Sequence, residues 1–226
     1  LGQGVLVDEL IKVAAAKNHA AIEALVTRLS QPGKEGFHAM QFQSLSYWAD
    51  LHPQASVRLS HVIGEARKIV RMPGGSSPLK IAAISLLGRE ENKFKSDRDL
   101  LGELLILSES SEMKFAVIEA LSRMAGPDIP RLLIGSWSGC FPRERSKIMD
   151  TLLQRKEWSM AMLKAIGQGQ ISPEAVDVSR RQILRTHADT GIKKMAEELF
   201  PSHGGLTRAR QLEKFRSALE LKANPK

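Results

Sequence analysis

The amino-acid sequence predicts an all-α protein, an α-α superhelix in which helix pairs stack on one another as a solenoid. Leu, Ala, Ile, Glu, Lys and Arg, which favour helices, dominate its 226 residues, and only 5% of the residues are aromatic. The runs of β-branched and aromatic residues that favour sheets are missing from the sequence. Apolar residues instead recur every three or four positions between short breaks rich in Gly, Pro and Ser, so each segment presents one apolar helix face.

Residues 1–73 contain four such segments, which we expect to form N-terminal helices. The sequence does not settle how these helices pair with one another. Their apolar stripes consist of Leu6, Leu10, Val13 and Ala14; of Ile22, Leu25, Val26 and Leu29; of Met40, Leu45 and Trp48; and of Val57, Val62, Ala66, Ile69 and Val70. Breaks follow the last three stripes at Pro32-Gly33, His52-Pro53 and Pro73-Gly74-Gly75.

Residues 76–171 contain an internal repeat. Ile84-x-x-Leu87 begins a pattern that returns at Ile118-x-x-Leu121 and at Met149-x-x-Leu152, at offsets of 34 and 31 residues. A hydrophobic-basic helix start recurs as well, at Leu79-Lys80, Met113-Lys114 and Ile192-Lys193. Each such helix is followed by a break and a second apolar segment, so one repeat is a helix pair. One pair cannot bury its own apolar face, and stacked neighbours complete the core.

Helix starts are marked by capping residues. Ser76-Ser77-Pro78 places a capping hydroxyl before a first-turn proline, and Ser172-Pro173-Glu174 has the same pattern. Ser96-x-x-Asp99 resembles a capping box. We expect helices over 172–199 and 205–221 to close the stack and 222–226 to be a linker. The sequence thus predicts a single domain over 1–226.

The composition of the sequence limits the classes of function that the protein can have. The net charge is +8, and the excess lies in the second half: residues 1–113 hold 13 basic and 13 acidic side chains, whereas residues 114–226 hold 20 and 12. No stretch approaches the roughly 20 apolar residues that span a bilayer. The single cysteine, Cys140, is expected in the core. Because the chain begins at Leu1 rather than Met, without a signal peptide, we interpret it as a piece of a longer protein.

The sequence offers no set of residues for catalysis. Its six histidines do not form an H-E-x-x-H metal pair, and we expect them to be isolated at the surface or at helix caps. The glycines at positions 74 and 75 precede a helix but lack the rest of a P-loop. We therefore predict no catalytic residue, no cofactor and no metal.

Two segments resemble the HEAT signature, a polar turn followed by a Val/Ile-Arg/Lys-x-x-Ala helix start. They are Ala55-Ser56-Val57-Arg58-Leu59-Ser60 and Asp189-Thr190-Gly191-Ile192-Lys193-Lys194-Met195-Ala196. The first has Ser where the signature has Ala. This resemblance makes the expected solenoid HEAT-like, or armadillo-type.

A longer stretch is similar to the helical segment of the large haem-binding "membrane-bound dehydrogenase" proteins of planctomycete and verrucomicrobial bacteria. The resemblance covers about residues 60–226, with Ala66-Arg67 and Leu86-Leu87-Gly88 as its looser part. Its more specific residues are Trp137, Pro142-Arg143, Leu152-Leu153-x-Arg155, Trp158, Leu163-x-x-Ile166, Gly169-x-Ile171, Arg180-Arg181-x-x-Leu184, Ala196-x-x-Leu199-Phe200 and Ala218-Leu219-x-Leu221.

This resemblance implies a context for the chain. In that family the helical segment joins a β-propeller to a cytochrome c domain, and the haem motif C-x-x-C-H follows the last helix. The chain ends at Lys226, before that motif, so neither flanking domain nor a haem site is expected in it. The resemblance implies protein partners, namely the propeller and cytochrome c domains, and a periplasmic or cell-envelope location.

Basic side chains gather near the end of the sequence and form a possible interaction surface. They are Arg180, Arg181, Lys193, Lys194, Arg208, Arg210 and Arg216. We interpret the protein as a non-catalytic protein-interaction and spacer module. The alternative is a HEAT-like nucleic-acid-binding protein, similar to the HEAT-like DNA-repair glycosylases. Few aromatic residues interleave the basic cluster, so base stacking has little support and nucleic acid is the less expected partner.

Overall fold

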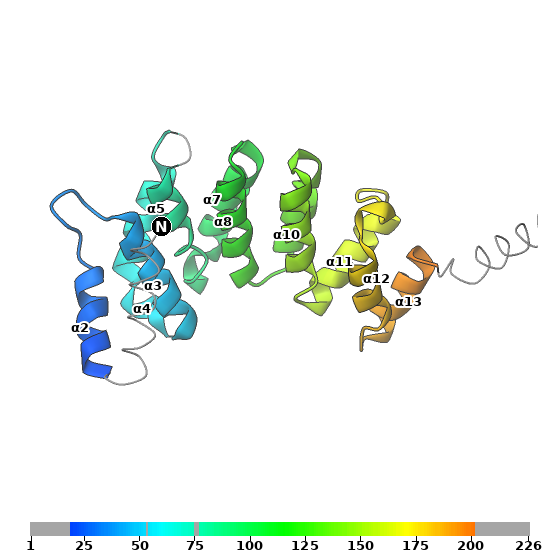
Figure 1. Ribbon diagram of the computed structural model, residues 1–226, viewed down its shortest axis with the longest axis horizontal. Coiled ribbons are helices and arrows are strands. Elements are labelled where there is room, and N and C mark those ends of the chain that lie inside the picture. Colours follow the sequence, from blue (N-terminus) through cyan, green and yellow to red (C-terminus); the bar gives the residue numbers. More distant parts are fainter. Residues whose placement is uncertain (1–18, 53, 75–76, 202–226) are drawn as a thin grey trace, which may run out of the picture. The chain divides into compact units, whose positions relative to one another are not determined.

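The computed structural model describes residues 19–52, 54–74 and 77–201, and most of these residues are helical (Figure 1). They form twelve α-helices and three short 3-10 helices. Their β structure is limited to one isolated bridge between Gly33 and Gly36. The prediction of an all-α protein is confirmed.

The helices follow one another with short connections. In the first part of the chain they are α2 (His19–Leu29), α3 (Ala39–Leu51), α4 (Ala55–Arg58), α5 (Ser60–Arg71), α6 (Pro78–Ile84), η1 (Glu91–Lys93), α7 (Phe94–Leu107) and α8 (Ser111–Arg123). They continue with α9 (Asp128–Gly135), η2 (Trp137–Gly139), α10 (Pro142–Leu152), α11 (Lys156–Gly167), η3 (Pro173–Ala175), α12 (Val178–Arg185) and α13 (Thr190–Leu199).

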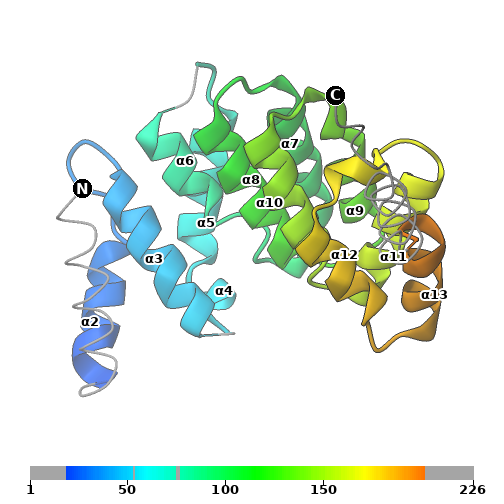
Figure 2. The same ribbon diagram turned by 45° about the vertical axis from the view of Figure 1, so that its right-hand side comes forward.

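The chain divides into two compact units, Leu1–Gln154 and Arg155–Lys226. In the first unit, α3 packs on α6, α6 on α8 and α8 on α10, and Figure 2 shows these four helices side by side in one row. Each of the last three also contacts a helix that precedes it in the sequence, α5 with α6, α7 with α8 and α9 with α10. The first unit is therefore built from stacked helix pairs. The superhelix as a whole stays a prediction.

The predicted repeat corresponds to the row of helices. Its apolar residues lie in α6, α8 and α10, or directly after α6, and every one of them is buried: Ile84, Leu87, Ile118, Leu121, Met149 and Leu152. Because α6 and α8 each have a neighbour in the row on either side, their apolar stripes are covered by residues of the adjacent helices.

The predicted start of α6 is confirmed, and α13 has a cap that was not predicted from the sequence. Ser77 is the N-cap of α6, where its hydroxyl accepts a hydrogen bond from the backbone N–H of Lys80 at 3.2 Å, and Pro78 occupies the first turn. Asp189 caps α13, and its carboxylate accepts from the N–H groups of Gly191 and Ile192 at 3.0 and 3.2 Å. Both residues satisfy backbone donors that a helix leaves unpaired at its first turn.

Two other predicted starts are wrong. Helix α7 begins at Phe94, so Ser96 lies inside its first turn and does not cap it. Ser172-Pro173 begins only the 3-10 helix η3, and α12 starts later, with Asp177 as the cap that accepts from the N–H of Arg180 at 3.0 Å. At α12 a second capping residue, Asp177, lies a few positions after Ser172 and provides a competing start that the local pattern does not rank.

The predicted stripe from Val57 to Val70 is also corrected. The helix is interrupted at Leu59, which separates the four-residue α4 from α5. Leu59 is fully buried, whereas the side chain of Val57 is 81% exposed. The break turns α4 so that the position expected in the core faces solvent.

In the second unit, α11 and α12 both pack on α13. Residues 172–199 form η3, α12 and α13 rather than one long helix. The predicted helix over 205–221, the linker over 222–226 and the stripe that begins at Leu6 lie outside the described residues. No described helix has the length and hydropathy required to cross a bilayer.

A buried ionic cluster fixes α5 against α7. Asp97 of α7 is fully buried and accepts from Arg67 of α5 through both carboxylate oxygens, at 2.6 and 3.0 Å. It also accepts from the N–H of Gly88 at 3.0 Å. Arg67 pairs in addition with Glu90 at 2.6 Å. Burial lowers the pKa of Arg67, but its bonds to Asp97 and Glu90 outweigh burial and raise that pKa.

Candidate functional site

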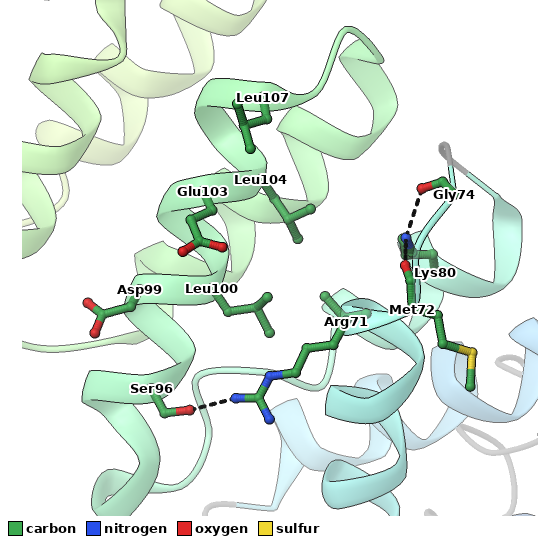
Figure 3. A pocket seen from close by; sticks show the side chains of 11 residues that line it. Arg71, Met72, Gly74, Lys80, Ser96, Asp99, Leu100, Glu103, Leu104 and Leu107 are labelled. Carbon is green, nitrogen blue, oxygen red and sulfur yellow. Dashed lines mark hydrogen bonds between the residues drawn. The ribbon is translucent and has the colours of Figure 1, made fainter.

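An open groove runs between the C-terminal end of α5, the loop after it and α7 (Figure 3). Its volume is about 580 Å³, which lies in the range of small ligand sites. The ionic cluster of Arg67 and Asp97 holds these two helices in place. The lining residues are Val70, Arg71, Met72, Gly74, Lys80, Ser96, Asp99, Leu100, Glu103, Leu104 and Leu107.

One wall of the groove is apolar. Leu100, Leu104 and Leu107 are spaced four and three residues apart on α7, so they share one face of that helix. Figure 3 shows Leu100 and Leu104 pointing toward the loop that follows α5. Leu100 and Leu104 are half-buried, whereas Leu107 is 77% exposed. Met72 lies on the other side of the groove and is 57% exposed.

The basic residues of the groove are bonded within the protein. Arg71 donates to the hydroxyl of Ser96 at 3.0 Å and so bridges α5 to α7. Lys80 is 6% exposed, and its ammonium donates to the carbonyls of Met72 at 2.7 Å and Gly74 at 3.1 Å (Figure 3). Lys80 thereby holds the loop that forms one side of the groove.

The acidic residues on the outer side of α7 and directly after it are more exposed to solvent. Asp99 is paired with Arg98 at 2.7 Å. Glu103 and Glu109 are exposed, and neither is bonded to a basic side chain within the described part of the chain. The groove therefore combines an apolar wall with an unneutralised acidic rim.

A second hollow of about 440 Å³ extends the groove toward the start of α8. It shares Gly74, Lys80, Leu104 and Leu107 with the first hollow and adds Ser108, Glu109, Ser110 and Met113. From Ser96 to Leu107 the groove follows α7 for about 17 Å, at 1.5 Å per residue.

The basic surface predicted from the sequence lies in the second unit, and two of its residues serve the unit itself. Arg180 forms an ion pair with Asp177, and its backbone N–H and guanidinium lower the pKa of that carboxyl. Arg181 donates to the carbonyls of Val176 at 2.6 Å and Pro173 at 2.9 Å, and it stacks on the ring of Phe200.

The other predicted basic residues are placed differently. Lys193 and Lys194 are exposed on α13 and make no hydrogen bond or ion pair with the described residues. Arg208, Arg210 and Arg216 lie outside the described residues. Of the four basic side chains that the structure describes, Lys193 and Lys194 are thus exposed and available for contact with a partner.

Three of the histidines and the cysteine have local roles in the described part of the chain. His38 and His52 are the N-cap and C-cap residues of α3, and His52 stacks on Trp48 with ring centroids 4.7 Å apart. Nδ1 of His187 accepts from the N–H of Asp189 at 2.9 Å. Cys140 is buried, and burial raises the pKa of its thiol. In the described ranges, no three His, Cys, Asp or Glu residues are grouped as a metal ion requires.

One feature of the sequence indicates the groove, although the helical periodicity of apolar residues did not reveal it. Leu101 and Leu105 occupy the buried face of α7, at 0 and 1% exposure. The run from Leu104 to Leu107 is apolar at every position, which exceeds what one buried helix face requires. Surplus apolar residues at the end of a helix indicate a second apolar face.

Comparison with models of known protein families and with curated protein sequences finds no match to this chain.

Proposed function

We propose that the protein is a non-catalytic protein-interaction and spacer module, and that the groove along α7 binds an amphipathic segment of a partner protein. The observation that carries the proposal is the apolar wall that α7 forms, where Leu107 is 77% exposed beside an open volume of about 580 Å³. Contiguous exposed apolar surface rimmed by polar groups is typical of interaction sites.

The charges of the groove indicate the chemistry of the partner segment. Arg71 and Lys80 already bond to groups of the protein. Glu103 and Glu109 are exposed and unneutralised along the outer side. A complementary segment presents apolar side chains to the leucines of α7 and at least one Lys or Arg to these acids.

The dimensions of the groove set the length of the segment. About 17 Å accommodates a helix of three turns, or about five residues of extended chain. A helical segment would place its anchors at three- and four-residue spacing, matching the spacing of Leu100, Leu104 and Leu107.

The wider context of the module comes from the resemblance to the haem-binding dehydrogenase proteins. We propose that the chain belongs to a longer redox protein and fixes the distance between its propeller and cytochrome c domains. Nucleic acid receives less support, because Arg180 and Arg181 bond within their own unit and leave fewer cations for phosphates.

Selection from a random peptide library tests the proposal. Peptides of about twelve residues, enough for three helical turns, are selected on the whole chain. We expect the enriched sequences to share two apolar anchors at helical spacing together with a basic residue. Replacing Leu107 by Glu should weaken their binding at least about tenfold, because burying an exposed leucine contributes on the order of 1.5 kcal/mol.

Ile106 provides the matched control. It is 69% exposed on the same helix but does not line the groove. Ile106→Glu should therefore leave the binding of the selected peptides within about twofold of wild type. Equal loss of binding in both variants, or enriched peptides insensitive to Leu107→Glu, would place the interaction elsewhere.

A further inference from the structure

Charged residues occupy equivalent positions near the ends of three adjacent helices in the row. Asp50 of α3, Arg89 after α6 and Arg123 of α8 each follow, by two positions, a buried residue of the apolar pattern. Those buried residues are Trp48, Leu87 and Leu121. The three charges therefore meet at the C-terminal ends of their helices, and they share no residue with the groove along α7.

The first two charges neutralise each other. Arg89 pairs with Asp50 at 2.8 Å and donates to the carbonyl and hydroxyl oxygens of Ser46 at 3.1 and 2.8 Å. The side chain of Arg89 is only 8% exposed, whereas that of Asp50 is 51% exposed. The carboxylate of Asp50 is thus accessible to solvent, whereas the guanidinium of Arg89 is not.

Arg123 has no such partner. Its guanidinium donates to the carbonyl of Ser85 at 2.8 Å, an oxygen to which Arg89 also donates at 3.3 Å. No carboxylate among the described residues lies within ion-pair distance of Arg123, and Glu119, one turn earlier on α8, is bonded to Lys147 at 2.5 Å. The Nε atoms of both arginines are buried without a hydrogen-bond partner.

Two guanidinium groups that share one acceptor repel each other. Burial, followed by the charge of Arg89, lowers the pKa of Arg123 to about 10, while Asp50 and Glu119 act in the opposite direction. Together, Arg89, Arg123 and Asp50 carry a net charge of +1. One additional negative charge would neutralise this group.

We propose that Arg123 binds one carboxylate of an Asp or Glu side chain from a partner protein, and that the neighbouring charge of Arg89 favours this binding. A guanidinium matches a carboxylate through two parallel N–H donors. The single net charge and the nearby carbonyl ends of the helices fit a monoanion and disfavour a phosphate dianion. The site extends the proposed function with a second contact, but its evidence is independent of the groove.

Nuclear magnetic resonance of the whole chain labelled with ¹⁵N-arginine tests this site, with sodium acetate as the carboxylate probe. We expect the side-chain resonance of Arg123 to shift and saturate with acetate and not with sodium chloride at the same ionic strength. Arg123→Gln should abolish the saturating response of Arg89. Inorganic phosphate provides the second arm and should bind more weakly than acetate.

Asp50→Asn keeps the test decisive if the Arg123 variant does not fold. Removing the competing carboxylate raises the local charge and should tighten acetate binding about fivefold. Asp99→Asn removes an exposed acid outside the site and should leave acetate affinity unchanged. An Arg123 resonance that does not respond to acetate in wild type and in Asp50→Asn would overturn the proposal. Tighter binding of phosphate than of acetate would also overturn it.

Discussion

Replacing Asp97 by Asn removes the central charge of the buried cluster between α5 and α7. The carboxylate is fully buried and accepts three hydrogen bonds, two from Arg67 and one from the N–H of Gly88. Removing one partner of a buried ion pair typically costs about 3–5 kcal/mol. Glu90 remains 2.6 Å from Arg67 and compensates in part, so we expect a loss of about 3 kcal/mol in the free energy of unfolding.

Thermal and urea unfolding, followed by circular dichroism, measure this loss. For a unit of about 150 residues, a loss of about 3 kcal/mol lowers Tm by roughly 6–12 °C. Asp99→Asn is the matched control, because it makes the same substitution two positions along α7 in an exposed ion pair. It should cost less than about 1 kcal/mol. Equal stability of the two variants would refute the view that the Asp97 cluster holds α5 on α7.

Other predictions concern glycine, pH and helix capping. Gly88→Ala should destabilise the protein by about 2–4 kcal/mol in urea unfolding, because φ is +74° and the new Cβ would lie 2.8 Å from Cγ of Met124; Gly64→Ala, with open space inside α5, should stabilise it by about 0.5–1 kcal/mol. Burial raises the pKa of Glu144, but hydrogen bonds from Ser111 and the backbone outweigh burial and lower it below 4.5. Its stabilisation is thus present above that pH and lost as pH falls through the folded-state pKa, so Glu144→Gln should flatten the stability profile below pH 4.5. Asp189→Ala should cost about 1 kcal/mol in the second unit, measured by hydrogen exchange of α13.

The sequence was sufficient for the features that depend on local periodicity. The apolar residues Ile118 and Leu121 are buried because the repeat places similar helices next to one another. The repeat pattern in the sequence therefore predicts which residues form the core. The start of α6 at Ser77-Pro78 was predictable for a similar reason, since the cap and the first-turn proline act within one turn.

The features that depend on packing between helices were not predictable. Val57 continues a helical stripe in the sequence, but the interruption at Leu59 turns it to solvent. The leucines of α7 form two stripes, and the packing of neighbouring helices such as α8, not the spacing of the leucines, decides that Leu101 is buried while Leu107 is left open. The unpaired charge of Arg123 likewise follows from the register of three helices far apart in the sequence.

Methyl resonances of the leucines, recorded with and without a peptide selected on the whole chain, test the central claim most directly. The proposed function predicts that the methyl groups of Leu100, Leu104 and Leu107 shift and saturate together, while those of the buried Leu133 and Leu163 do not move. Shifts confined to α12 and α13, or an unperturbed α7 at saturating peptide, would contradict the assignment of the groove as the interaction site.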